Sequence, residues 1–178
     1  MIRHVRCPIS ESDKIMLARQ VRAQYAERQI SVDSRMSARD QTISTTEFET
    51  RLPYLCVTRQ GGGLPRKRRD LHIVLRSVAL LLDRSVNYAE PALNAALRRW
   101  LEEVGYNFRL DHVTLRRSLV DYCYVVRDPA GTRYRVAGDH DDLFDPMIES
   151  LDPVFIIEEA MARREAKRKA FLSSKRGQ

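Results

Sequence analysis

Apolar residues recur at helical spacing in three successive stretches in the middle of this chain. Between Asp70 and Asp83 they fall at i, i+3, i+4, i+7 and i+11, which makes one continuous stripe along a helix. A second helix is predicted to begin at Glu90-Pro91, because proline is tolerated in a first turn, and to end at Gly105. A third is predicted from Asp111 to Tyr122. The pattern therefore predicts three short helices in a row.

The pattern changes after the third helix, where apolar and polar residues alternate as in a strand. Asp128-Pro-Ala-Gly131 is a turn sequence in the middle of this stretch, so a β-hairpin is predicted from Tyr124 to Val136. A short strand is also predicted at Val86 to Ala89. In the hairpin, the residues expected to face inward are Tyr124, Val126, Tyr134 and Val136. Three helices and a hairpin indicate a winged helix-turn-helix, with one core that contains Leu75, Leu97, Trp100, Leu115 and Leu119.

Weaker patterns flank this centre. A helix is predicted from Ser12 to about Arg28, a loop or extended edge from 29 to 46, and a strand from Tyr54 to Thr58. Gly61-Gly-Gly63 predicts a break, because glycine loses much backbone freedom in any regular element. Asp152-Pro153 predicts the start of a last helix, whose apolar stripe of Val154, Ile157 and Met161 fades into basic residues.

The expected fold class is α+β, with a winged helix-turn-helix core at 64–136. An N-terminal segment with one helix, otherwise extended or loop, is expected at 1–63. An acidic linker and a basic C-terminal helix are expected at 137–178.

Charge is spread unevenly along the chain, whose net charge is +7. Residues 64–136 carry 14 basic and 8 acidic groups, whereas residues 137–178 carry 7 and 9. A basic centre suits an anionic polymer, although it is also compatible with solubility alone. Because acids dominate 139–159, this stretch is expected to fold back over part of the basic surface.

The third helix has a polar face that can contact a ligand. At about 100° per residue, Leu115 and Leu119 fall on the packed side, Thr114, Arg117 and Asp121 on the opposite side, and Arg116 on the flank. Such a face can enter a major groove, where arginine donates to O6 and N7 of guanine. The alternative is that Arg117 and Asp121, four residues apart, only pair with each other on a solvated surface.

Basic residues outside this helix complete the predicted nucleic-acid site. The hairpin arginines are expected to contact the sugar–phosphate backbone, or else to protect the edge of a small sheet from pairing. A basic run precedes the first helix. The full predicted set is Thr114, Arg116, Arg117, Arg127, Arg133, Arg135, Arg66, Lys67 and Arg68.

Several motifs occur in a fixed order between residues 62 and 136: Leu64-Pro65-Arg66-Lys67, Tyr88-x-Glu90, Leu93-Asn94, Leu97, Leu115-Arg-Arg-x-Leu-Val-Asp-Tyr122, Arg127 and Gly131-x-x-Tyr134. In these motifs the segment resembles a bacterial family known as domain of unknown function number 2087. The family occurs alone or joined to helix-turn-helix regulators, so the resemblance implies work linked to transcription. Two positions depart from it: Cys123 replaces the usual glycine, and Pro91 stands where an ordinary helical residue is expected.

The sequence gives little support for catalysis, a cofactor, a metal site or a membrane span. The chain contains no P-loop, Gly-x-Ser-x-Gly or His-Glu-x-x-His motif, so neither an enzyme nor a cofactor is expected. The three cysteines form no Cys-x-x-Cys pair, and no apolar stretch reaches the length of a membrane span. No secretory signal is recognised at the N-terminus, so a cytoplasmic location is predicted. One cluster could supply metal ligands, but it lacks the spacing of a Ca²⁺ loop, so no metal is expected: Asp139, His140, Asp141, Asp142 and Asp145.

The sequence thus predicts a DNA-binding accessory protein or transcription regulator, with duplex DNA as its partner. Two alternatives stay open: a protein-interaction adaptor built on a winged-helix scaffold, and an RNA- or ribosome-associated basic protein. A fold alone does not decide among them. The pattern does not indicate the oligomeric state.

Overall fold

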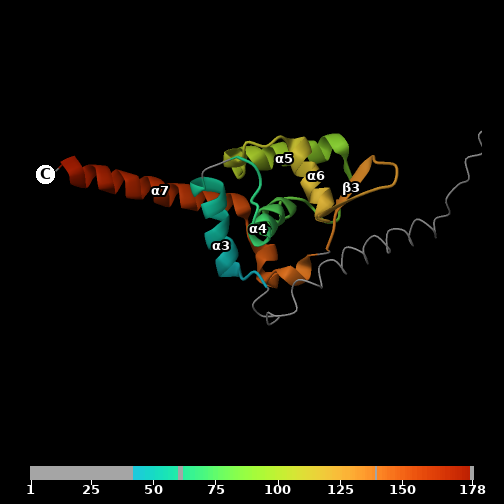
Figure 1. Ribbon diagram of the computed structural model, residues 1–178, viewed down its shortest axis with the longest axis horizontal. Coiled ribbons are helices and arrows are strands. Elements are labelled where there is room, and N and C mark those ends of the chain that lie inside the picture. Colours follow the sequence, from blue (N-terminus) through green and yellow to red (C-terminus); the bar gives the residue numbers. More distant parts are fainter. Residues whose placement is uncertain (1–41, 60–61, 139, 177–178) are drawn as a thin grey trace, which may run out of the picture. The chain divides into compact units, whose positions relative to one another are not determined.

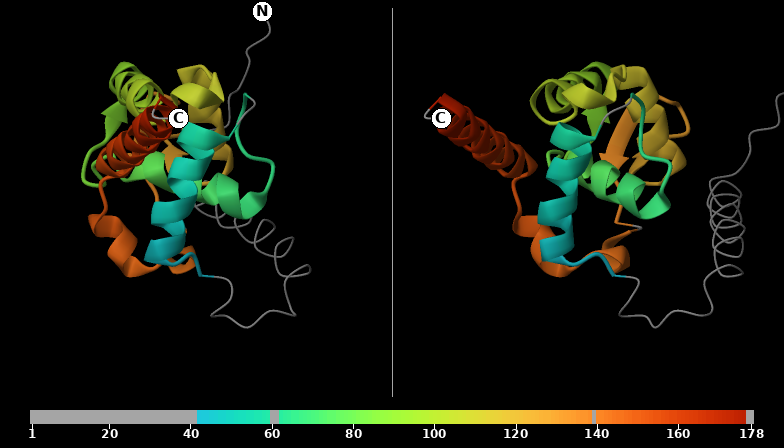
Figure 2. Two further views of the ribbon diagram at one scale, coloured as in Figure 1. Left: turned by 90° about the vertical axis from the view of Figure 1, so that its left-hand side faces the viewer. Right: turned by 60° about the vertical axis from the view of Figure 1, so that its left-hand side comes forward.

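The computed structural model describes residues 42–59, 62–138 and 140–176. The predicted helix at Ser12 to Arg28 lies outside these ranges. The described residues combine helices with one small antiparallel sheet, so the predicted α+β class is confirmed. Figures 1 and 2 show the elements, which in chain order are α3 (Thr45–Pro53), a π-helical turn (Tyr54–Thr58), α4 (Arg68–Ala79), β1 (Tyr88–Ala89), α5 (Glu90–Glu103), α6 (His112–Asp121), β2 (Val125–Arg127), β3 (Arg133–Val136) and α7 (Pro153–Arg176), with 3-10 turns at Tyr106–Phe108, Asp141–Leu143 and Pro146–Ser150.

The three central helices pack around the core that the sequence predicts. Leu75, Leu97, Leu115 and Leu119 are fully buried, and so is Trp100. The indole N–H of Trp100 donates to Ser77 Oγ at 3.2 Å, which satisfies the polar atom of this buried side chain. Gly105 ends α5 where a Cβ atom would overlap the Trp100 ring, so only glycine fits there.

The sheet has the order β1-β3-β2, and both pairings are antiparallel. Val125 lies opposite Val136, and Arg127 lies opposite Tyr134. Residues that lie directly opposite each other point to the same face of a sheet. Val125, Tyr134 and Val136 are buried, so this is the face that covers the core.

One prediction for the hairpin is wrong, because Val125 rather than Val126 is buried. Tyr124 is also buried but precedes β2, so strand alternation starts one residue later than the sequence suggested. Cys123 makes the turn from α6 with a φ of 56°, the left-handed conformation that glycine favours. The turn therefore keeps a glycine-like backbone at the position where the family that this segment resembles usually has glycine.

The predicted strand at Tyr54 to Thr58 is also wrong, since these residues form a π-helical turn that continues α3. Phe48, Leu52, Leu55 and Cys56 are buried at helical spacing across the junction. Ser44 caps α3 by accepting the Glu47 N–H at 3.2 Å. The Ser-x-x-Glu spacing of a capping box was the available signal, whereas a short apolar run fits a strand or a helix equally.

The core extends beyond the central segment on both sides. Ile43 forms a parallel bridge with Phe144: its N–H donates to the Leu143 carbonyl at 2.8 Å, and its carbonyl accepts the Asp145 N–H at 2.9 Å. Ile43, Phe144, Ile148 and Ile157 all belong to the same buried cluster as the central helices. One core therefore continues through the positions where the predicted segments meet, between residues 63 and 64 and between residues 136 and 137.

The last helix begins as predicted. Asp152 accepts the Val154 N–H at 2.9 Å, and α7 follows from Pro153. Its predicted apolar stripe ends early: Ile157 is fully buried, but Met161 is 45% exposed and the side chains of 162–174 are exposed. No helix within the described ranges is both long and apolar enough to cross a membrane.

Candidate nucleic-acid interface

Helix α6 presents the polar face that the helical wheel predicts. Its first turn is fixed by Asp111, which accepts the Thr114 N–H at 2.7 Å and the Thr114 hydroxyl at 3.1 Å. The backbone N–H of Thr114 also holds the pKa of Asp111 below its usual range. Thr114, Arg117 and Asp121 are exposed. The Thr114 hydroxyl is thus engaged within the protein, whereas Arg117 and Asp121 face outward.

The alternative in which Arg117 and Asp121 only neutralise each other is not realised. Within residues 42–59, 62–138 and 140–176, no ion pair joins the Arg117 guanidinium to the Asp121 carboxylate. Their neighbours on other helices do form such pairs at this spacing, as Arg99 and Glu103 do at 3.0 Å. Both side chains of the α6 face are therefore available to a ligand.

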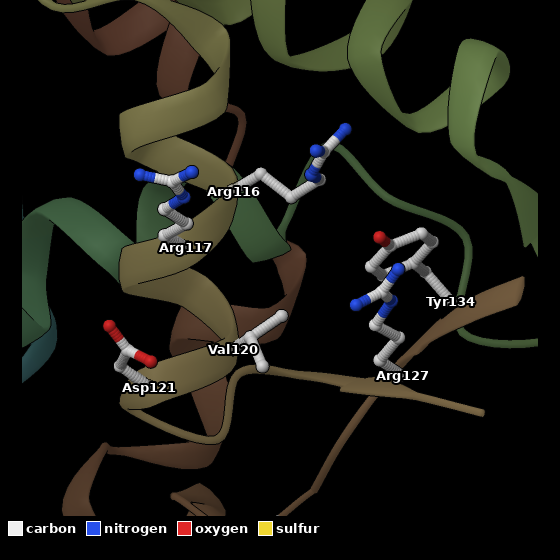
Figure 3. Close-up of a pocket in the computed structure, with 6 residues that line it drawn as sticks. All are labelled: Arg116, Arg117, Val120, Asp121, Arg127 and Tyr134. Carbon is white, nitrogen blue, oxygen red and sulfur yellow. The ribbon is translucent and has the colours of Figure 1, made fainter. Parts of the chain in front are cut away.

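A recess of about 230 Å³ lies between α6 and the hairpin (Figure 3). Arg116 and Val120 project from α6 toward the hairpin, where Arg127 lies in front of the Tyr134 ring, while Arg117 lies across the viewer-facing side of the helix and Asp121 lies at its left edge. The lining of the recess brings three guanidinium groups together with one carboxylate, and such a lining favours an anionic ligand. The residues that line it are Arg116, Arg117, Val120, Asp121, Arg127 and Tyr134.

Arg116 is held inside the protein and is only 15% exposed. It forms an ion pair with Glu90 at 2.8 Å and donates to Asn94 Oδ1 at 2.6 Å. Its guanidinium carbon lies 5.7 Å from the centre of the Tyr134 ring, and the Tyr134 hydroxyl donates to Glu90 at 3.3 Å. Arg116 therefore ties α5, α6 and β3 together, so its place in the predicted set is that of a support for the recess.

Arg127 is positioned by the hairpin turn. It donates to the Gly131 carbonyl through Nε at 3.1 Å and Nη2 at 2.8 Å, and it lies 5.6 Å from the centre of the Tyr134 ring. Gly131 has a φ of 74°, and a Cβ atom there would lie 2.6 Å from Arg127 Nη2. A side chain at 131 would displace the guanidinium, so the turn glycine keeps Arg127 at the recess.

The other hairpin arginines lie elsewhere. Arg133 and Arg135 alternate with Tyr134 and Val136 along β3, so they point to the opposite face of the sheet from Tyr134. Both are exposed. The three hairpin arginines are therefore divided by the sheet, with Arg127 alone at the recess.

The basic run before the first central helix does not line the recess. Arg66, Lys67 and Arg68 are exposed at the start of α4, where Lys67 is the cap residue. The next residue, Arg69, is turned inward to Glu47 at 2.5 Å and to the Thr42 carbonyl at 2.9 Å. This run is thus a separate stretch of positive surface.

The acidic segment folds back, but onto α4 rather than onto the predicted nucleic-acid surface. Asp141 pairs with Arg84 at 2.9 Å and with Arg76 at 3.1 Å, and Glu149 pairs with Arg84 at 2.6 Å and also with Arg76. Hydrogen bonding to Arg84 lowers the pKa of Asp141. Asp145 caps the turn at Met147. The expectation that these acids cover the nucleic-acid surface is therefore corrected.

A buried histidine lies beneath this acidic segment. His72 is 4% exposed, its Nδ1 lies 2.9 Å from the Tyr124 hydroxyl, and its ring lies 5.0 Å from that of His140. Burial lowers the pKa of His72 to about 4, so the ring is neutral at pH 7. Among the described residues, no three His, Cys, Asp or Glu side chains gather as a metal site, and Asp139 lies outside them.

Residues 62–136 match the model of a family described as "Uncharacterized protein conserved in bacteria (DUF2087)", which confirms the resemblance of the central segment. The chain matches no curated protein and no solved structure. The motifs of the resemblance contain the supports of the recess, which the helical wheel alone did not identify: Glu90, Asn94, Arg116, Arg127, Gly131 and Tyr134. The matched segment is thus the part of the chain that builds the recess.

Proposed function

We propose that this protein binds duplex DNA through α6 and the hairpin, as an accessory protein or regulator of transcription in the cytoplasm. The helix–strand–helix–helix–hairpin order of 68–136, with the sheet order β1-β3-β2, supports its interpretation as a winged helix-turn-helix. In such a domain, the helix before the hairpin enters the major groove and the hairpin contacts the backbone. Here those elements are α6 and β2–β3.

The observation that carries the proposal is the state of Arg117. It is exposed on α6, lines a recess with two further guanidinium groups, and has no ion-pair partner among the described residues. Arg116 and Arg127 are held in place by Glu90 and by the Gly131 carbonyl, so the recess keeps its positive charge without a ligand. Arg117 is therefore the residue proposed to read a base, and Arg127 the one proposed to contact phosphate.

The test is the salt dependence of duplex retention. Fluorescence anisotropy with a labelled duplex should show binding at about 50 mM salt that weakens steeply by about 200 mM, because arginines that neutralise phosphates release condensed counterions. Absence of binding at the lower salt, or binding that ignores salt, contradicts the proposal. An RNA duplex of the same sequence, used as competitor, separates DNA from RNA binding.

Three variants divide the surface by role. Arg117→Ala should change the sequence preference, whereas Arg127→Ala should weaken binding to all duplexes alike. Arg99→Ala is the matched control, because Arg99 is exposed on α5 and already paired with Glu103. Equal effects of all three variants would show that only bulk charge matters.

A protein-interaction adaptor is the second candidate. It is favoured by large apolar side chains exposed on α7, among them Phe155 at 59% and Met161 at 45%. If the protein fails to retain nucleic acid and Arg117→Ala changes nothing, this candidate gains.

A further inference from the structure

Asp121 stands out on the proposed nucleic-acid surface, because a carboxylate there repels phosphate. Other carboxylates of α5, α6 and the hairpin are engaged within the protein: Glu90 binds Arg116, Asp111 caps α6, and Asp128 accepts two backbone N–H groups of the hairpin turn. Asp121 lines the recess and is exposed, yet within the described residues it pairs with no cation. The fold leaves this one acid open at the mouth of a basic recess.

Its position relates it to Arg117. Residues 117 and 121 lie one turn apart on the outward face of α6, a rise of about 6 Å along the helix axis. Figure 3 shows both side chains on the same side of the helix. Since successive base pairs are about 3.4 Å apart, the two side chains of a helix in the major groove reach base pairs within about two steps of each other. Asp121 would therefore meet a base within about two steps of the one that Arg117 contacts.

The chemistry of the two groups is complementary. Arginine only donates, and in the major groove its fork matches the two acceptors of guanine. An ionised carboxylate only accepts, so it is satisfied by an exocyclic amino group, N4 of cytosine or N6 of adenine. Against any base that presents only acceptors, and against phosphate, it is a desolvated and repelled charge. The two side chains would therefore select a DNA sequence in two ways: Arg117 attracts guanine at one position, and Asp121 repels bases that present only acceptors at a nearby position.

We propose that Asp121 is a specificity-determining residue, which accepts a hydrogen bond from a base amino group near the guanine bound by Arg117. The inference rests on the proposed function and deepens it. Its consequence is opposite to that of an ordinary contact: removing the Asp121 charge tightens binding to unrelated duplexes and reduces sequence discrimination. A residue that only contributed to net charge would tighten all binding and leave the discrimination unchanged.

The experiment compares Asp121→Asn with Glu102→Gln in the full chain. Glu102 is exposed on α5, outside the recess lining, so the two variants remove the same charge. A preferred duplex is first selected from a randomised pool with the wild-type protein, and anisotropy then gives the affinity of each protein for it and for an unrelated duplex. Asp121→Asn should reduce the ratio of the two affinities by about fivefold or more, because one base contact contributes about 1–3 kcal/mol of discrimination. Glu102→Gln should leave the ratio unchanged.

Each outcome decides a separate point. A second selection with Asp121→Asn should lose the requirement for one base, and that base identifies the amino group as that of cytosine or of adenine. If both variants leave the ratio unchanged, or both selections return the same bases, the role of Asp121 is overturned while salt-dependent binding still upholds the proposed function. If the wild-type protein retains no duplex at about 50 mM salt, the proposed function fails, and this inference fails with it.

Discussion

Arginines gather at two places in this protein, and the two differ in what surrounds the guanidinium groups. On α4 and just after it, Arg76 and Arg84 share the carboxylates of Asp141 and Glu149. At the recess, Arg116 has Glu90 and Arg127 has a backbone carbonyl, which leaves Arg117 exposed. The first cluster is internally neutralised and the second retains positive charge.

The carboxylates that surround an arginine, rather than the number of arginines, decide whether its charge is neutralised within the protein. Arg76 is 3% exposed, so its charge is tolerated only because two acids meet it. Arg117 is exposed and has no ion-pair partner among the described residues, so it can contact a ligand without breaking an interaction of the fold. The two clusters should therefore respond in opposite ways to substitution: loss of stability at α4, loss of binding at the recess.

The largest expected loss of stability distinguishes the buried side of α6 from its exposed side, which carries Arg117. Leu119→Ala should lower the free energy of unfolding by about 2–5 kcal/mol, because Leu119 is fully buried and the change leaves a cavity. Arg117→Ala, two residues earlier and exposed, should change it by no more than about 0.5 kcal/mol. Urea unfolding followed by circular dichroism measures both. Comparable losses in the two variants would mean that Arg117 has a structural role, which would contradict the contrast between the two arginine clusters.

Lowering the pH should destabilise the fold through the buried His72 of α4. The folded pKa of His72 is lowered from 6.5 to about 4 by burial, with smaller contributions from His140 and Arg68. Between those two pH values the unfolded chain binds more protons than the folded chain, so stability falls as the pH is lowered through this window. The total loss is about 3 kcal/mol, since one pKa unit corresponds to about 1.4 kcal/mol.

Urea unfolding at pH 7, 6, 5 and 4.5 tests this. His72→Gln should reduce the pH dependence of the free energy of unfolding, because the glutamine side chain does not titrate. His112→Gln is the control, because His112 is only half-buried at the start of α6. An equal flattening in the control would assign the effect to general charge rather than to the buried ring.

Removing the buried arginine should cost more than removing its exposed neighbour. Arg76→Ala leaves Asp141 and Glu149 with one cation fewer and should lower the free energy of unfolding by about 2–3 kcal/mol, less than for a fully buried pair because both acids are half exposed. Arg84 is 41% exposed, so Arg84→Ala should lower it by at most about 1 kcal/mol. Thermal unfolding ranks the two, and the reverse order would show that burial does not govern this cluster.

A loss of stability smaller than that of Arg76→Ala is expected at the hairpin turn. Gly131→Ala should lower the free energy of unfolding by about 1–2 kcal/mol, because φ is 74° there. It should also weaken duplex binding, since the new Cβ displaces the Arg127 guanidinium. Gly63→Ala is the control: its φ is 82°, but a Cβ atom there meets no other atom within 4 Å. If both substitutions weaken binding equally, the placement of Arg127 does not depend on the turn.

The sequence by itself determined most of the local structure between 64 and 136. The helical period placed three helices, the Asp-Pro-Ala-Gly turn placed the hairpin, and Leu115 and Leu119 were correctly assigned to the packed side of α6. These features depend on periodicity, capping and turn chemistry, which act over a few residues and are written directly in the order of the chain. The motifs of the central segment also indicate the family whose model matches residues 62–136.

Only the tertiary structure decided which charges meet. Arg76 and Asp141 are 65 residues apart in sequence, yet they pair, whereas Arg117 and Asp121, four residues apart, do not. The strand from Tyr54 to Thr58 failed for a related reason, since a short apolar run takes its conformation from what it packs against, here the end of α3. Ion pairing depends on distance in space and on burial, and a one-dimensional pattern contains neither. The sequence therefore determined which residues are candidates for the proposed nucleic-acid surface, and the fold decided that Arg117 and Asp121 are exposed while Arg116 supports the recess.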